Sequence, residues 1–182
     1  FVGLDLYFLG IPRFAFGTRR WWKLTPDAFG AYTQGTWSRL ADSRVARTAF
    51  ASAVLADGRV IVCGGEYSDA SGTIKLDYNN SCEIYDPVAN RWTPFGSPVT
   101  PGNQPTTWDY IGDSPGALLP DGKFLLGSLS NQNVAKLDPV TLTWTAMKDR
   151  PGVFSSDEDT WVLMPDNTIA APSCMNPPDT WV

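Results

Sequence analysis

Short apolar runs separated by turn-forming residues recur along the whole chain. Runs such as RVIV, FLLG and TIAA are bounded by Gly, Pro, Asp and Asn. Apolar stretches of this length with such boundaries predict β-strands joined by tight turns. No stretch combines a 3.6-residue apolar period with helix caps, so we expect an all-β protein.

The strands belong to units that repeat. One unit runs from LADGRVIVCGG at Leu55 to CEIYDPVANRWTPF at Cys82, and a second from LPDGKFLLGS at Leu119 to AKLDPVTLTWTAM at Ala135. A third begins with MPDNTIAAPS near the end of the chain, and WWKLTPDAFGAYTQGTWSRL from Trp21 has the form of the second half of an earlier unit. Repeats of this kind are typical of architectures in which each unit packs on its neighbours.

Constant spacing supports one register for these units. Asp86 and Asp138 are 52 residues apart, Trp92 and Trp144 are also 52 apart, and Trp37 precedes Trp92 by 55. The intervals between the Asp-Gly-type turns vary more, which places insertions in particular loops. Asp-Gly pairs at 57–58 and 121–122 favour two-residue hairpins in which both residues tolerate positive φ.

Each strand can be placed from these signals. In the first complete unit we expect strands near 50–55, 59–63, 81–86 and 91–95, and in the second near 115–119, 123–127, 134–138 and 143–147. A later unit begins with strands near 160–164 and 168–172, the segment 21–40 supplies two strands of an earlier unit, and 4–9 supplies one more.

The first complete unit resembles the kelch family. Its strand Val60–Cys63 ends in Gly64 and Gly65, and is followed by Tyr85 and Trp92. The second unit departs from this pattern, with a serine at 128 and a leucine at 137, although it keeps its tryptophan. The resemblance implies a partial kelch-type β-propeller of about three four-stranded antiparallel blades, related to the central propeller of galactose oxidase-like proteins.

This resemblance divides the chain into blades. Residues 1–20 are irregular or part of an earlier blade, 21–175 are kelch-like and 176–182 are a tail; within 21–175 we place the outer half of a blade at 21–40, blade one at 41–95, blade two at 96–147 and the start of blade three at 148–175. About three blades do not close a ring, since closed propellers have about four to eight. We therefore expect completion by the rest of a longer chain, with a second copy as the alternative.

Several residues of the repeat are expected to be structural. Gly64 and Gly65 allow the chain to turn where neighbouring blades crowd. Tyr85 and the tryptophans are expected to bury large rings between adjacent sheets. The tryptophans of this series are Trp37, Trp92 and Trp144.

Composition excludes several functions. The formal net charge is −5, so a nucleic-acid surface is not expected. The chain has no histidine, which excludes His-ligated zinc, a Ser-His-Asp triad and the histidine-based copper site of galactose oxidase relatives within this segment. The apolar N-terminal stretch carries Asp5 and Arg13 and resembles neither a signal peptide nor a membrane span. An acidic, aromatic-rich composition slightly favours an extracytoplasmic protein.

The candidate binding residues lie on the long connections, where scaffold-mounted loops usually carry function. They are Arg47, Glu66, Tyr67, Trp108, Asp109, Tyr110, Asp113, Asp157, Glu158 and Asp159. Asp113 and Glu158 each precede their turn by eight positions, so we expect them at equivalent places at the channel mouth. Solvated acidic loops are the simplest interpretation; sugar or peptide binding is the functional one, and we expect no metal or cofactor, with Ca²⁺ as the alternative.

We therefore expect a non-catalytic module that binds a glycan or protein through its long-loop face. The alternative is a fragment of a carbohydrate-active enzyme that uses Asp113 and Glu158 as acid and base. Cys63 and Cys82 face each other in the predicted hairpin, within reach of a disulfide, although two buried thiols are the favoured interpretation. Cys174 has no expected partner.

Overall fold

The computed structural model describes residues 17–66, 78–100, 102, 106–152, 155–174 and 180–181. In these residues the protein is all-β, as predicted, and no helix long and apolar enough to cross a membrane is found among them. The strand expected near 4–9 lies outside the described residues.

The strands form four antiparallel sheets. They are β1 (Trp22–Thr25), β2 (Thr36–Arg39), β3 (Ala51–Val54), β4 (Val60–Cys63), β5 (Cys82–Asp86), β6 (Arg91–Phe95), β7 (Gly116–Leu118), β8 (Phe124–Gly127), β9 (Val134–Asp138), β10 (Thr143–Ala146), β11 (Val162–Leu163), β12 (Ile169–Pro172) and β13 (Thr180–Trp181). β3–β6 form blade one and β7–β10 form blade two, each in sequential order, while β1–β2 and β11–β13 are smaller sheets. The strands of both blades lie where the repeats predicted them. β13 pairs with β12 within the segment 176–182 that was expected to be a tail.

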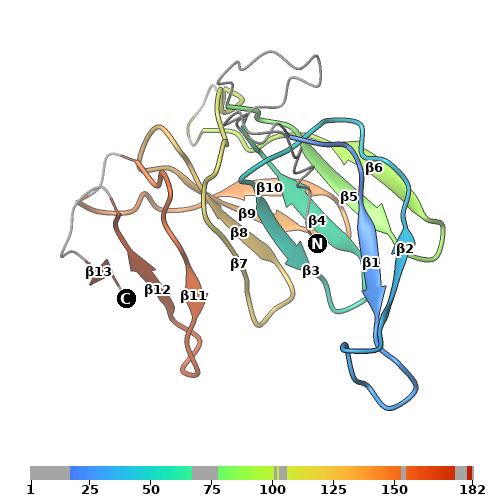
Figure 1. Ribbon diagram of the computed structural model, residues 1–182. Coiled ribbons are helices and arrows are strands. Elements are labelled where there is room, and N and C mark those ends of the chain that lie inside the picture. The colour runs from blue at the N-terminus through green and yellow to red at the C-terminus, as the bar shows by residue number, and fades with distance from the viewer. Residues whose placement is uncertain are drawn as a thin grey trace, which may run out of the picture.

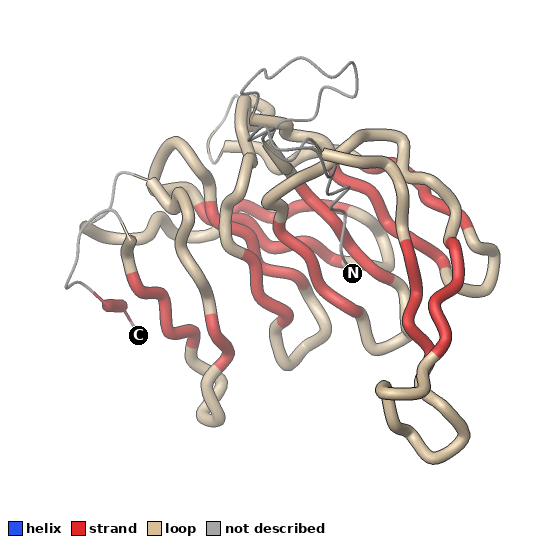
Figure 2. Tube along the Cα trace, viewed as in Figure 1, coloured by secondary structure: helices blue, strands red, loops and turns tan. Residues whose placement is uncertain are grey.

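The sheets lie side by side around a common inner region, with β1–β2 at one end and β11–β13 at the other (Figures 1 and 2). The first strands of successive sheets meet, because β3 contacts β7 and β7 contacts β11. The last strands, β6 and β10, lie on the outer side of their sheets. This convergence of first strands is the arrangement of propeller blades.

Blade one is buried on both faces. Successive side chains of a strand point to opposite faces of the sheet, and β4 follows this rule. Ile61 and Cys63 belong to a core shared with Phe124 of blade two, whereas Val60 and Val62 pack in a separate core with Trp21. The continuous apolar run of β4 is thus explained by a neighbouring sheet on each side.

A tryptophan in the last strand of each blade is bonded to the preceding sheet. The Trp92 indole Nε1–H donates to the Ala41 carbonyl oxygen at 2.9 Å, just after β2. The Trp144 Nε1–H donates to the Gly96 carbonyl oxygen at 2.7 Å, just after β6. The predicted packing role of these two rings is confirmed, with Trp92 buried and Trp144 partly buried.

The expectation that Trp37 is buried is wrong, since its side chain is 53% exposed. Trp37 occupies the equivalent place in β2, but no sheet precedes β1–β2 in the described part of the chain. The ring that fills this core is instead Trp21, whose centroid lies 4.7 Å from that of Trp92. The sequence repeat predicts that a tryptophan occupies this position, whereas the burial of its side chain depends on whether another sheet covers it.

The hairpin turns differ in detail from the prediction. The Gly58 N–H donates to the Leu55 carbonyl, and the Leu55 N–H donates to the Arg59 carbonyl, so three residues form the turn. Gly58 has φ 85°, whereas the Asp57 carboxylate accepts the Arg59 backbone N–H at 3.0 Å. Only the glycine therefore uses positive φ, and the two-residue hairpin prediction is wrong.

Cys63 and Cys82 form a disulfide, so the preference for two free thiols is wrong. They are partners in the pairing of β4 with β5, and their Cα atoms are 4.2 Å apart. The neighbouring Gly64 N–H donates to the Ser81 carbonyl, which leaves Cys63 and Cys82 as a pair without mutual backbone hydrogen bonds. Such pairs bring side chains closest, which favours a bond between the sulfurs.

The first prediction concerns the tryptophans. Trp92→Ala should lower the free energy of unfolding by about 3–5 kcal/mol, because it removes a buried ring and leaves a cavity. Trp37→Ala is the matched control and should change it by less than about 0.5 kcal/mol. Urea denaturation followed by circular dichroism measures both, and equal losses would contradict the assignment of Trp92 to the contact between sheets.

The second prediction concerns the disulfide. In denaturant without reductant, iodoacetamide should modify only Cys174, which is the free cysteine. Replacing Cys63 and Cys82 together by alanine should lower the free energy of unfolding by about 3 kcal/mol, because the bond constrains the unfolded chain. Mass spectrometry and denaturation measure these outcomes, and labelling of all three cysteines without reductant would disprove the bond.

Candidate functional site

The connection leaving β4 is bonded to the connection that leads into β7. The Gly65 N–H donates to the Gly112 carbonyl oxygen at 2.7 Å, and the Gly112 N–H donates to the Asn79 carbonyl at 3.1 Å. Glu66 and Asp113 are the residues that follow these two glycines. These backbone bonds between blades one and two therefore fix the backbone positions from which the side chains of Glu66 and Asp113 extend.

Glycine is required at this junction, as the sequence predicted. A Cβ on Gly64 would lie 2.4 Å from the Gly112 carbonyl oxygen and 2.4 Å from a methyl carbon of Ile111. Gly65 has φ 116°, a conformation that side-chain-bearing residues rarely adopt. The Gly-Gly pair thus permits the close approach of two blades that places the carboxylates.

The next junction is also joined by a backbone hydrogen bond, although its donor lies in the loop that enters the later sheet. The Ser156 N–H donates to the Ser128 carbonyl oxygen at 3.1 Å, where Ser128 follows β8 as Gly65 follows the last residues of β4. The Ser114 N–H donates to the Ile111 carbonyl and the Asp159 N–H donates to the Ser156 carbonyl, so the two loops contain the same turn. The expected equivalence of Asp113 and Glu158 is therefore confirmed. The acid of the second turn that reaches the cluster is nevertheless Asp157, the residue before Glu158.

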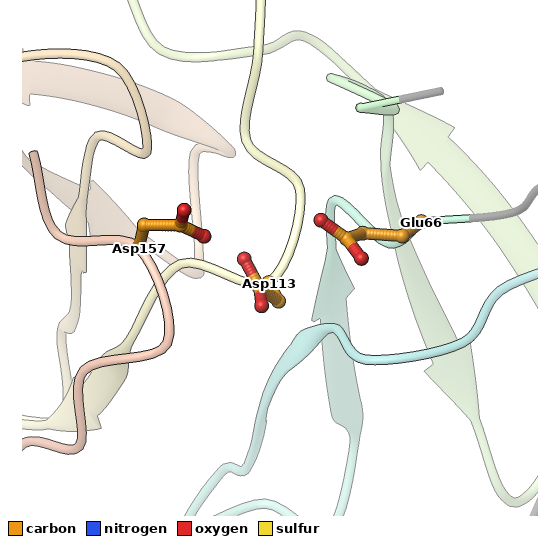
Figure 3. A group of neighbouring side chains, drawn as sticks. All are labelled: Glu66, Asp113 and Asp157. Carbon is orange, nitrogen blue, oxygen red and sulfur yellow. The ribbon is translucent and has the colours of Figure 1, made fainter. Parts of the chain in front are cut away.

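Glu66, Asp113 and Asp157 form a carboxylate cluster (Figure 3). One oxygen from each lies within 4.8 Å of the others, and all three side chains are partly buried. Burial raises the pKa of Asp113 to about 7, assisted by a hydrogen bond with Asp157 and by repulsion from Glu66 and Asp157. Its Oδ1 atom is buried and has no hydrogen-bond partner. The cluster therefore holds one carboxyl group that is about half protonated at neutral pH, beside two other acids.

An exposed aromatic ring lies close in sequence to the cluster. Tyr110 is 45% exposed, and its ring is in edge contact with Tyr78 at a centroid distance of 5.7 Å. Tyr78 approaches Gly112, because a Cβ built on that glycine would lie 3.1 Å from the Tyr78 ring. Asp109 is also exposed. Tyr67 lies outside the described residues.

Other candidate residues are buried in the scaffold. Trp108 is 3% exposed and belongs to the core between blades one and two, so it offers no ring face to a ligand. Arg47 is 1% exposed and forms an ion pair of 2.9 Å with the buried Glu83. Asp159 is also buried and pairs with Arg150 at 2.5 Å. Glu158 is exposed and is not part of the cluster.

Arg47 connects the end of β4 and the start of β5 in blade one. Its guanidinium donates to the Gly64 and Ser81 carbonyls, and Glu83 also accepts the backbone N–H groups of Arg44 and Val45. Burial lowers the pKa of Arg47, while the hydrogen bond and charge of Glu83 oppose that shift. Its role in the fold is to hold the loop before β3 against the end of β4.

The cluster is a group of hydrogen-bond acceptors. Ionised carboxylates accept hydrogen bonds and bind hard cations, and Ca²⁺ takes six to eight oxygen ligands. Three carboxylates would supply part of such a shell. The sequence analysis included all three acids among the candidate binding residues but did not predict that they lie together. It did not include Tyr78. Each of the three acids directly follows a residue whose backbone is hydrogen-bonded between blades, namely Gly65, Gly112 or Ser156, and this position identifies the cluster.

The third prediction concerns pH. Because the folded-state pKa of Asp113 is raised above its usual 3.8 to about 7, its contribution to stability is full below pH 3.8 and is lost as pH rises through 7. Asp113→Asn should flatten this dependence and stabilise the protein above pH 7 by on the order of 1 kcal/mol, since solvent screens part of the repulsion. Denaturation between pH 4 and 8 measures it, with the exposed Asp109→Asn as control. A slope that Asp113→Asn leaves unchanged would refute the assignment.

Comparisons with known proteins agree with this architecture. Residues 47–98 match the kelch motif model. The solved structure of YjhT is similar with a TM-score of 0.57 and 16% identity, covering 79% of this chain and 48% of that chain. A fungal alcohol oxidase of the AA5 family, solved in complex with copper, has a TM-score of 0.31 and 14% identity over 86% of this chain and 55% of that chain. A comparison with curated proteins gives no match.

The chain spans about half the length of these two solved structures. At such identity, the likeness to YjhT concerns the fold alone. The match to the motif covers blade one, together with Arg47 in the loop before β3 and Glu66 in the connection from β4 to β5. The chain therefore contains a kelch motif and forms a partial kelch-type β-propeller.

Proposed function

We propose that this propeller module binds a glycan through the carboxylate cluster of Glu66, Asp113 and Asp157. The observation that carries the proposal is the convergence of three acids from successive blade junctions, with oxygens within 4.8 Å. Sugar hydroxyls are donors, and carboxylates are strong acceptors for them. The exposed ring of Tyr110 offers an apolar face that a sugar ring can cover.

The charge of the cluster narrows the class of glycan. Asp113 is largely protonated below its pKa of about 7, and therefore donates one hydrogen bond while the other two acids accept. An acidic sugar would be repelled by the ionised members, whereas neutral sugars and amino sugars would not. We therefore infer a preference for neutral or amino-substituted oligosaccharides.

The fourth prediction tests this function. On an array of oligosaccharides the protein should retain neutral or amino-substituted members, and calorimetry with the best of them should give a dissociation constant raised about tenfold by Glu66→Gln or Asp157→Asn. Glu158→Gln is the matched control, because it removes one charge from the same loop without altering the cluster. Circular dichroism verifies that each variant is folded.

Several outcomes would contradict the proposal. Retention of acidic glycans alone, of protein ligands alone, or equal weakening by Glu158→Gln would each overturn it. Binding that requires Ca²⁺ and is abolished by EDTA would assign the cluster to a cation in place of direct contact with sugar.

A second candidate function is glycoside cleavage, favoured by the pairing of Asp113 and Asp157. A protonated acid beside an ionised one is the combination that glycoside hydrolysis uses. This pairing replaces the Asp113 and Glu158 pair expected from the sequence. Release of reducing sugar during the same incubations, lost in Asp157→Asn and retained in Glu158→Gln, would support cleavage over binding alone.

A further inference from the structure

The hydrogen bonds of the blade tryptophans follow a constant spacing along the chain. The Trp92 indole donates to the Ala41 carbonyl, and Ala41 lies four residues after Trp37. The Trp144 indole donates to the Gly96 carbonyl, and Gly96 lies four residues after Trp92. Each of these two indoles is therefore bonded to the backbone four residues beyond the tryptophan of the preceding sheet.

This series leaves one donor and one acceptor without a counterpart. The Trp37 side chain is exposed, and its indole donates no hydrogen bond within the described residues. Lys148 lies four residues after Trp144, and no hydrogen bond to its carbonyl oxygen is found in the described part of the chain. Trp37 belongs to the first sheet of the row, whereas Lys148 lies beside the last one (Figure 1). They are the donor and the acceptor that the spacing specifies for one further bond.

The residue three positions after each tryptophan supports the next ring. Leu40 packs in one core with Trp92, and Phe95 stacks on Trp144 with a centroid distance of 6.4 Å. Met147 occupies the corresponding position after the last tryptophan of the series and is exposed. A thioether makes favourable contacts with aromatic rings, so Met147 is suited to support a tryptophan.

The face of β1–β2 that carries Trp37 is apolar. Leu24 is the pairing partner of Trp37, and Trp22 precedes Leu24 by two residues, so the three side chains share one face of the sheet. Trp22 is exposed, and the Arg39 guanidinium lies 5.7 Å from the centroid of its ring. An exposed face of this composition indicates an interaction surface.

The region beside Lys148 is hollow and also apolar. A cavity of about 330 Å³ lies between blade two and the sheet of β11 and β12, with walls that include Leu125, Val134 and Ile169. Between blades one and two, the corresponding core includes Trp144 of the outer strand β10. The sheet β11–β13 has no counterpart of β10 among the described residues, so the cavity marks the place of an outer strand that carries a tryptophan.

We propose that a second copy of this chain docks here, with its β1 and β2 as the outer strands of the last blade. Trp37 of the second copy packs on Met147 and donates to the Lys148 carbonyl, and the same contact forms in reverse at the other end of the pair. Each copy thus supplies three blades, and two copies close a ring of six, within the range of about four to eight for closed propellers. β13 is only two residues long, and β1 of the second copy takes its place beside β12.

The open inner faces at the two ends of the row are complementary as well. Beside β3 and β4 lies a cavity of about 250 Å³ whose lining includes Val54, Val60 and Val62. At the other end, β11 exposes Val162 and Leu163. Closure places β11 and β12 of the second copy between β1 and this cavity, so apolar surface is buried on both sides. Because this chain supplies both halves of the contact, we infer a second copy and not a different protein.

Sedimentation equilibrium and size-exclusion chromatography with light scattering test the proposal on the whole chain. We expect a dimer that dissociates on dilution. Trp37→Ala should raise its dissociation constant about thirtyfold, because buried tryptophans dominate interface energies. Met147→Asp should raise it by about the same factor, since it buries a charge against the ring. Trp37→Phe keeps a ring but loses the donor, and should raise it about threefold.

Phe29→Ala is the matched control, because Phe29 is exposed in the turn between β1 and β2. It should leave the dissociation constant unchanged, as should Glu66→Gln, so dimerisation is tested separately from glycan binding. Circular dichroism verifies that each variant is folded. The comparison of Trp92→Ala with Trp37→Ala concerns the monomer and is made below the dissociation constant.

A mixture of Trp37→Ala and Met147→Asp tests the reciprocal arrangement. A mixed dimer places both substitutions in one contact and leaves the other intact, whereas each variant alone carries a substitution in both contacts. The mixture should therefore dimerise about tenfold more tightly than either variant. A monomer at the highest soluble concentration, which would favour completion by a longer chain, would overturn the proposal. Open-ended assemblies, a dimer unaffected by Trp37→Ala and Met147→Asp, or no gain on mixing would also overturn it.

Discussion

The packing of each sheet on its two neighbours is the constraint on which the rest of the structure depends. The middle strands of blade one alternate between two cores, so Ile61 packs toward blade two and Val62 toward Trp21. Neither face of such a sheet is stable in water, because an exposed apolar face loses the hydrophobic contribution of its burial. The bonds from Trp92 and Trp144 to the preceding sheets add a directional contact to this packing.

Close packing of the sheets also determines the chemistry of the inner loops. Where β3 and β7 converge, the chain leaving β4 meets the chain entering β7, and glycine is needed for the backbone bond between Gly65 and Gly112. The next residues, Glu66 and Asp113, are consequently held together although their charges repel. A scaffold of this rigidity can maintain a carboxyl group with a pKa near 7, as at Asp113, which a flexible loop would relieve by separating the acids.

The fold was largely predictable from the sequence, since apolar runs, Asp-Gly turns and spaced tryptophans depend on local pattern. Features that depend on which sheets lie next to each other were not predictable from the sequence. Trp37 has the same sequence context as Trp92 but lacks a covering sheet among the described residues, and loop position did not reveal that Trp108 is buried. The cluster was only partly predictable, because counting back from the turn correctly pairs Asp113 with Glu158, whereas the side chain that reaches the cluster belongs to the preceding residue, Asp157.

The carboxylate cluster and the Arg47 network both lie where loops meet, but they differ in how far hydrogen bonding is completed. Both terminal nitrogens of Arg47 are bonded, although its Nε has no partner. In the cluster the buried Oδ1 of Asp113 has no hydrogen-bond partner and lies beside two further acids. Buried polar atoms are usually paired, so under the glycan-binding proposal this oxygen is where a ligand donor would add a bond.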